Sequence, residues 1–166
     1  MTDLEFMDEA LALARASAAE GEVPVGCVIV RNGEIVGRGR NRREQVRNAL
    51  SHAEIEAIND ACRTLGGWRL WECTLYVTLE PCPMCAGAIV NARIPRVVFG
   101  ASDEKCGACG SVCDIFNMGF NHHPKVECGI LEEKCAGLLT EFFAKLRVEL
   151  RSRPKWKPRT ASADDP

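Results

Sequence analysis

The order of the apolar segments constrains the fold of this chain most strongly. An apolar run at 25–31 leads into Asn32-Gly33, a dipeptide that readily adopts the positive φ angles of a tight hairpin turn, and then into a second strand near 34–39. Helical and strand-like segments alternate after that hairpin, which predicts an α/β fold of three layers: a mixed sheet of about five strands with helices on both faces. The other expected elements are helices at 3–20, 52–65, 82–92 and 132–151, and strands at 73–79, 96–100 and around 126.

Length and composition indicate one globular domain. The chain has 166 residues, of which 46% are hydrophobic and 27% charged, enough for a single core. We expect one folded, functional domain over 1–152 and a polar, basic tail over 153–166. The acidic first twenty residues do not resemble a signal peptide, and no apolar run is long enough for a membrane span, so we expect a cytoplasmic protein without membrane contact.

Ten cysteines are many for a chain of this length. Without an export signal, and with Cys-x-x-Cys pairs present, reduced thiols that partly serve as metal ligands are favoured over a disulfide framework. Cysteines within apolar patterns are instead expected to be small buried side chains: Cys27, Cys62, Cys73, Cys128 and Cys135.

The segment Pro81-Cys82-Pro83-Met84-Cys85 predicts a metal site at a helix start. Thiols three residues apart on a helix lie on one side of it, and a helix N-terminus favours the thiolate form that binds metal. A third ligand must come from one of three histidines, and His52 is favoured because it begins a helix next to acidic residues. Two thiolates, one imidazole and an open position are typical of catalytic zinc. Alone, His52 could equally be a polar first-turn residue.

The acid that works beside the metal stays open on helical geometry alone. Glu56 shares the helix face of His52, whereas Glu54 points roughly the opposite way. Ser51 and Glu54 also have the spacing of a helix capping box, which would give Glu54 a purely structural role.

The residues His52-Ala53-Glu54 followed by Pro81-Cys-x-x-Cys85 match the signature of zinc-dependent nucleobase deaminases. From the first helix to about 151, the chain more specifically resembles the bacterial tRNA-specific adenosine deaminases. The segments that carry this resemblance are Glu22-Val-Pro-Val-Gly26, His52-Ala-Glu-Ile55, Thr74-Leu-Tyr-Val-Thr-Leu-Glu-Pro-Cys82, Arg96-Val-Val-Phe-Gly100, Gly107-Ala-x-Gly-Ser111 and the Phe142-Phe143 helix.

The resemblance implies a cytidine-deaminase-like fold and hydrolytic conversion of adenosine to inosine at the wobble position of a tRNA anticodon, most readily in an arginine tRNA. It implies one zinc ion held by His52, Cys82 and Cys85, with Glu54 rather than Glu56 as the proton shuttle. It also implies a homodimer that binds the tRNA anticodon stem-loop.

Substrate contacts follow from the same resemblance. Asn41 and Val25 match residues that contact the target base, and Asp103 and Lys105 match residues near the flanking nucleotides. Taken without the resemblance, Asn41 could be an ordinary turn residue, and Asp103 a loop cap.

Basic clusters suit an RNA partner although the net charge is only −2. One cluster lies in the 38–47 segment, and the second near the C-terminus includes Arg147 and Arg151, which we expect to contact RNA; a solvated helix face is the alternative. A second zinc site at Cys106, Cys109 and Cys113 is disfavoured, because no fourth ligand is evident. The rival functions are a free-base deaminase for guanine or cytosine on the same fold, a non-catalytic zinc-stabilised RNA-binding module and a redox protein that uses Cys82 and Cys85.

Overall fold

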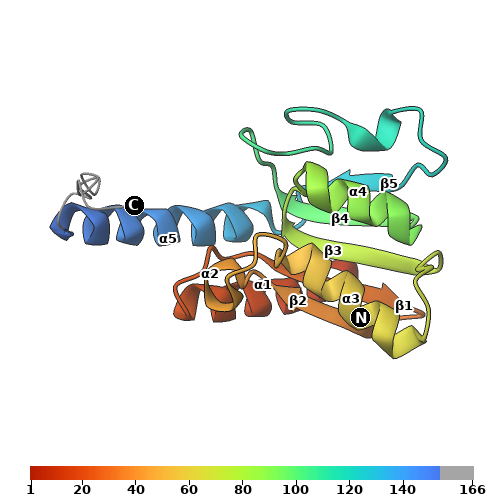
Figure 1. Cartoon of the computed structure of the whole chain (residues 1–166), viewed down its shortest axis with the longest axis horizontal. Coiled ribbons are helices and arrows are strands. Elements are labelled where there is room, and N and C mark those ends of the chain that lie inside the picture. The colour runs from red at the N-terminus through yellow and green to blue at the C-terminus, as the bar shows by residue number, and fades with distance from the viewer. Residues whose placement is uncertain (154–166) are drawn as a thin grey trace, which may run out of the picture.

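A computed structural model describes residues 1–153 of the chain (Figure 1). The predicted basic tail over 153–166 therefore lies outside the described residues, apart from Arg153. In chain order the elements are α1 (Asp3–Ala19), β1 (Gly26–Arg31), β2 (Glu34–Arg40), α2 (Arg43–Val46), α3 (Ala53–Leu65), β3 (Cys73–Leu79), α4 (Pro83–Ala92), β4 (Arg96–Ala101), η1 (Ile115–Asn117), β5 (Lys125–Cys128) and α5 (Glu132–Ser152).

One mixed sheet of five strands organises the molecule, in the order β2-β1-β3-β4-β5. β1 runs antiparallel to both β2 and β3, whereas β3, β4 and β5 are parallel. Asn32 and Gly33 have φ angles of 52° and 79° and turn β1 into β2, as their sequence predicts. The predicted mixed sheet is thus confirmed.

Helices cover both faces of the sheet. Successive side chains of a strand point to opposite faces, so each central strand packs against both helical layers. Ile29, Val77 and Val97 belong to one apolar cluster together with residues of α3 and α4. Val28, Tyr76 and Val98 belong to a second cluster with residues of α1 and α5. In Figure 1, α3 and α4 lie in front of the sheet and α1 lies behind it. The protein therefore has the three layers expected from its sequence.

Helix α1 begins with a capping box, in which the Thr2 hydroxyl accepts a hydrogen bond from the Glu5 amide and the Glu5 carboxylate accepts one from the Thr2 amide. Its buried side includes Met7, Leu11 and Ala14. Leu4, which has the same spacing, is instead 52% exposed. Phe6, and not Leu4, is the apolar side chain of the first turn that packs on the sheet: it is 4% exposed and its ring lies 5.2 Å from that of Tyr76 on β3.

A close contact between α3 and β2 positions the start of α3. A Cβ added to Gly39 of β2 would lie 2.0 Å from the Ala53 carbonyl oxygen and 2.4 Å from the Ala57 amide nitrogen. Only glycine leaves room for the helix backbone at this distance. The first turn of α3 is therefore held directly against the sheet.

Helix α5 departs from the sequence prediction. The spacing of its apolar residues predicts a buried side made of Leu138, Leu139, Phe142, Phe143 and Leu146. In the structure only Cys135 of its 21 residues is buried, and Phe143 is 40% exposed. Beyond its first turns the helix runs away from the sheet (Figure 1), so no other layer of residues 1–153 covers its apolar side. Cys128 is likewise exposed, because β5 is an edge strand. Among residues 1–153, no helix has the length and apolar character needed to cross a membrane.

Candidate active site

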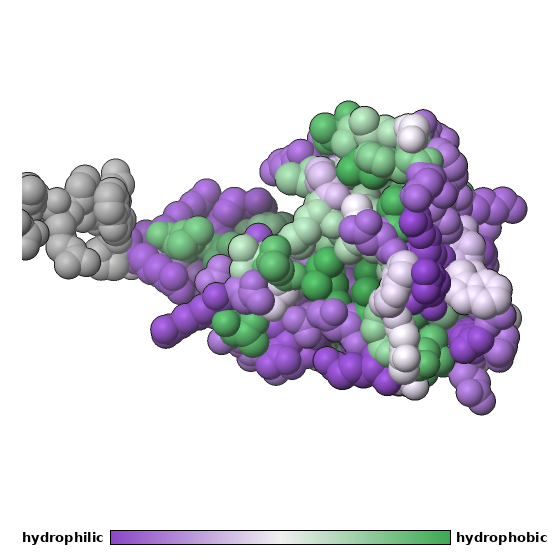
Figure 2. All heavy atoms as spheres, turned by 45° about the vertical axis from the view of Figure 1, so that its right-hand side comes forward, coloured by the Kyte–Doolittle hydropathy of each residue, from purple (hydrophilic) through white to green (hydrophobic). Residues whose placement is uncertain are grey.

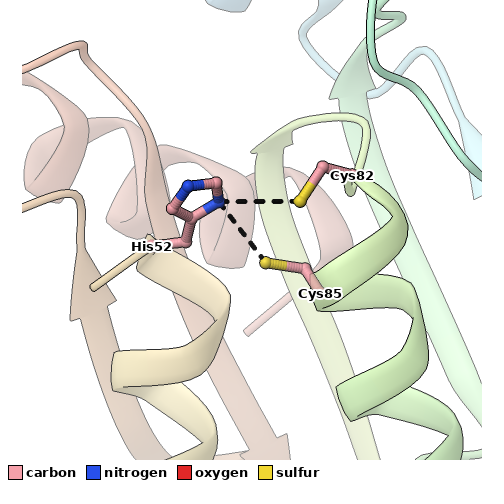
Figure 3. Close-up of side chains that lie close together, drawn as sticks. All are labelled: His52, Cys82 and Cys85. Atoms are coloured by element: carbon pink, nitrogen blue, oxygen red, sulfur yellow. Dashed lines mark hydrogen bonds between the residues drawn. The ribbon is translucent and has the colours of Figure 1, made fainter. Parts of the chain in front are cut away.

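Two helix N-termini bring the predicted metal ligands together. His52 is the N-cap of α3 and Cys82 is the N-cap of α4, with Cys85 in the first turn of α4. His52 Nδ1 lies 3.7 Å from Cys82 Sγ and 3.6 Å from Cys85 Sγ, and Figure 3 shows both sulfurs directed at the imidazole ring. Within the described residues, this is the one group of three or more such side chains close enough to share a metal ion.

The ligand geometry fits zinc. Tetrahedral zinc bonds of about 2.3 Å to sulfur and about 2.05 Å to nitrogen place the two ligand atoms roughly 3.6 Å apart. The observed separations of His52 Nδ1 from the two sulfurs, 3.6 and 3.7 Å, have this length. Three protein ligands of this kind leave the fourth tetrahedral position to a water or a substrate.

The surroundings favour a thiolate at Cys82. A hydrogen bond from the Cys85 thiol, together with the nearby His52 imidazole, lowers the pKa of Cys82 to about 4. The same hydrogen bond and burial raise the pKa of Cys85. The partnership with Cys82 raises the pKa of His52. One thiol thus ionises before any metal binds, and metal binding would draw the proton from the second.

Glu54 lies in the first turn of α3 and is only 4% exposed. Burial raises the pKa of its carboxyl group to about 7, a value suited to proton transfer near neutral pH. The N-cap of α3 is His52 and it makes no side-chain capping bond, so the Ser51–Glu54 capping box does not form. Glu54 faces the same cavity as His52, whereas Glu56 is not among the residues that line it.

A cavity of about 660 Å³ opens beside these residues. Its walls come from the segment before β1, the starts of α3 and α4, the loop that follows β4, and α5. The lining residues are Val23, Val25, Asn41, Arg43, His52, Ala53, Glu54, Leu79, Glu80, Cys82, Ser102, Asp103, Glu104, Lys105, Cys106, Leu139 and Phe143.

Asn41 lines this cavity and is held in place by two hydrogen bonds. Its amide nitrogen donates to the Val23 carbonyl at 3.2 Å, and its backbone carbonyl accepts from the Ser17 hydroxyl at 2.9 Å. Its side-chain oxygen is buried and has no hydrogen-bond partner within residues 1–153. A buried acceptor without a partner is costly, and a ligand that carries a donor would satisfy it.

Asp103 and Lys105 also line the cavity, on the loop after β4. The Asp103 carboxylate accepts hydrogen bonds from the Lys105 amide at 3.0 Å and the Cys106 amide at 3.2 Å. Asp103 therefore caps a turn of the loop, which is the structural role that its sequence context allowed.

Other residues considered in the sequence analysis do not join the metal site. Arg147 and Arg151 are exposed on α5 and do not line the cavity. In the described part of the chain, the three sulfurs are not close enough to share one metal ion at Cys106, Cys109 and Cys113. His122 and His123 bond to the backbone carbonyls of Ile94 and Phe116, each at 2.7 Å.

Sequence reasoning assigned no role to Glu80, although this residue lines the cavity and is only 2% exposed. An acid directly after the apolar segment 73–79 was the available signal. Phe143 was expected in the core but instead contributes to the cavity wall.

Comparison with known proteins identifies the family. A family model for MafB19-like deaminases matches residues 1–147. A tRNA-specific adenosine deaminase of Bacillus subtilis is 48% identical over 151 residues, which span 90% of this chain and 94% of that protein. The chain belongs to the tRNA-specific adenosine deaminases.

Solved structures with a similar fold agree with the assignment of this deaminase to its family. A structure from studies of A-to-I editing by tRNA:A34 deaminases at the wobble position of transfer RNA has a TM-score of 0.79 and 44% identity, and the match covers 81% of this chain and 99% of that one. A guanine deaminase from Nitrosomonas europaea has a TM-score of 0.70 and 25% identity, with coverage of 85% and 84%. The fold is therefore shared with enzymes that act on a free base, while the higher similarity is to the tRNA enzymes.

Proposed function

We propose that this deaminase uses one zinc ion to convert adenosine to inosine at the wobble position of a tRNA anticodon, with release of ammonia. The observation that carries the proposal is the meeting of His52, Cys82 and Cys85 beside the buried acid Glu54, in a chain 48% identical to a tRNA-specific adenosine deaminase. The family resemblance points to an arginine tRNA as the substrate.

Zinc bound by His52, Cys82 and Cys85 would supply a Lewis acid that brings the pKa of a water molecule toward neutrality. The chain itself supplies the proton transfers. Glu54, with a carboxyl pKa of about 7, accepts one proton from the attacking water and passes it to the purine ring nitrogen. It then takes the second proton from the hydroxyl that has added to the ring carbon and delivers it to the amino group, which leaves as ammonia. Burial of Glu54 keeps bulk water from competing for these protons.

The cavity contains groups suited to a purine. Val25 offers an apolar surface, and the buried Asn41 side-chain oxygen offers an acceptor to a base amino or ring N–H group. Asp103 and Lys105 lie farther along the same wall, where nucleotides on either side of the target base would pass. These four residues are our proposed substrate contacts.

RNA contacts outside the cavity would come from two basic segments. Arg42, Arg43 and Arg47 lie on or beside α2, near the cavity entrance that Arg43 lines. Arg147 and Arg151 lie on exposed turns of α5. Flexible cations of this kind suit phosphate groups.

We further propose a homodimer that acts in the cytoplasm, where tRNA is available. Three large hydrophobic side chains of the segment around η1 are exposed: Val112 at 58%, Met118 at 52% and Phe120 at 48%. Figure 2 shows hydrophobic side chains gathered over this segment, at the top of the view. Such a patch is typical of a protein–protein contact, and size-exclusion chromatography with light scattering tests for a second copy.

The decisive experiment incubates the zinc-loaded protein with an arginine tRNA anticodon stem-loop carrying adenosine at the wobble position. We expect reverse transcription and sequencing to read that adenosine as guanosine. Free guanine, cytosine and adenine form the parallel arm. Turnover of a free base without inosine in the RNA would overturn the proposal in favour of a free-base deaminase. RNA binding without any deamination would favour a non-catalytic RNA-binding module.

A further inference from the structure

We propose that Glu80 is a positioning residue that fixes the loop of residues 102–111, and with it Asp103 and Lys105, against the nucleotides that flank the target adenosine. The inference rests on the proposed function and adds a specificity role for a side chain that takes no part in the proton transfers. Glu80 stands directly after β3 and two residues before the metal ligand Cys82. A single short segment thus connects the metal site to the recognition loop.

The Glu80 carboxylate accepts hydrogen bonds along the whole loop. One oxygen accepts from the backbone amides of Cys109 and Ser111, both at 3.0 Å. The other accepts from the Asp103 amide at 2.9 Å and from the Ser111 hydroxyl. Two ends of the loop are therefore tied to one side chain, and through it to the end of β3.

The loop backbone is shaped around this carboxylate. A Cβ added to Gly107 would lie 2.4 Å from the Glu80 carboxyl carbon and 2.4 Å from one of its oxygens. The Gly107 amide donates to the Asp103 carbonyl at 2.8 Å, and the Ala108 amide donates to the Pro81 carbonyl at 2.8 Å. The loop therefore encloses the acid, and any larger residue at position 107 would push the two apart.

These contacts separate the role of Glu80 from that of Glu54. Both acids are buried and both line the cavity. Four donors of the loop already occupy the acceptor positions of Glu80, so it is not available to take a proton from water. The connection from Glu80 to substrate instead passes through Asp103, whose own carboxylate caps the turn that holds Lys105.

A glutamine at position 80 tests this connection selectively. Its amide oxygen can still accept from Cys109 and Ser111, and its NH₂ group can donate to the Ser111 hydroxyl oxygen. The NH₂ group would then face the Asp103 amide, so donor would meet donor at this one contact. Glu80→Gln should therefore release the Asp103 end of the loop while the opposite end stays anchored.

The experiment measures steady-state deamination by zinc-loaded wild type and Glu80→Gln, using anticodon stem-loops that differ only in the nucleotides next to the target. We expect KM for the preferred stem-loop to rise about tenfold with kcat nearly unchanged, and the preference among flanking nucleotides to shrink by a similar factor. Zinc content should stay at the wild-type level. Glu127→Gln is the matched control, because Glu127 accepts hydrogen bonds from Arg96 on β4 and lies outside the cavity lining.

Gly107→Ala tests the same contact without changing residue 80, since the added methyl group would displace the Glu80 carboxylate. We expect the same rise in KM and the same loss of preference among flanking nucleotides. When Glu80→Gln and Gly107→Ala are combined, their effects on KM should not add. Unchanged KM and preference in both folded, zinc-loaded variants would overturn the inference, as would a fall in kcat alone. Inactive wild type would instead show that the proposed function has failed.

Discussion

Cys85 Sγ lies 3.6 Å from His52 Nδ1, although 33 residues separate the two along the chain. The contact depends on the N-termini of α3 and α4 meeting at one place beside the sheet, and the backbone N–H groups at the start of α4 favour the thiolate forms of its two cysteines. The site is therefore a product of helix packing on the sheet and of helix electrostatics together.

Cys85→Ser should remove the metal. Loss of one thiolate leaves two protein ligands, and we expect the zinc content to fall from about one ion per chain to a small fraction, with deamination lost in parallel. Metal analysis by mass spectrometry after gel filtration measures this. Cys128→Ser, at an exposed cysteine of β5, is the control and should keep full zinc content. Full zinc content in Cys85→Ser would contradict the ligand assignment.

Glu54→Gln should separate metal binding from chemistry. The amide cannot carry protons between water and the leaving amino group, so we expect kcat to fall at least about 100-fold while zinc remains bound. Glu56→Gln is the matched control and should retain most of the activity, because Glu56 does not line the cavity. Zinc loss in Glu54→Gln, or an equal loss of activity in both variants, would argue against Glu54 as proton shuttle.

Gly39→Ala should weaken both the fold and the metal site. The added methyl would meet the Ala53 carbonyl and Ala57 amide of α3, so the start of the helix that carries His52 must shift. We expect the free energy of unfolding to fall by about 1–3 kcal/mol, accompanied by weaker zinc binding. Urea unfolding and chelator competition measure the two effects. Gly67→Ala, where an added Cβ meets nothing within 4 Å, should change neither.

Acid should weaken the anchor of α1. Asp3 accepts hydrogen bonds from Arg96 at 2.7 Å and from the Tyr76 hydroxyl at 2.6 Å, and these bonds hold the pKa of Asp3 below its usual value. A lowered folded-state pKa contributes stability above the unfolded-state pKa of about 3.9, and the contribution is lost as the pH falls further. Because the pair is partly exposed, we expect an effect of about 1 kcal/mol or less.

Urea unfolding at pH values between about 6 and 3 tests this anchor, with Asp3→Asn as the comparison. Wild type should lose its advantage over Asp3→Asn as the pH falls below about 4. A difference between the two proteins that stays constant across this range would show that the ionised carboxylate contributes nothing.

Local patterns were sufficient to predict the sheet. The Asn32-Gly33 turn, the β-branched run at 73–79 and the proline at the start of α4 each act through nearby backbone geometry, which a sequence displays directly. The ligand set also followed from spacing and from the small number of histidines. Spacing could not decide between Glu54 and Glu56 as the proton shuttle, because that choice depends on how α3 enters its first turn beside the cavity.

The spacing of apolar residues predicted burial wrongly where burial requires a second element to pack against the helix. The apolar spacing of Leu4 and Phe143 correctly indicates one side of a helix, but it cannot show whether anything covers that side. The role of Glu80 was equally hidden, since three of its four donors are backbone amides of the 102–111 loop, which no residue type encodes. Both cases depend on distant parts of the chain.

The proposed metal ligands lie at the starts of helices packed against the sheet, whereas much of the cavity wall comes from the 102–111 loop and α5. The reaction centre and much of the wall that faces the substrate therefore belong to different parts of the chain, which can change independently during evolution. Loop and helix residues can diverge and alter which nucleobase enters, without rebuilding the reaction centre. Solved structures of this fold include one named for guanine deamination and one named for editing of transfer RNA. An engineer who seeks new base specificity would therefore leave α3 and α4 intact and vary the wall.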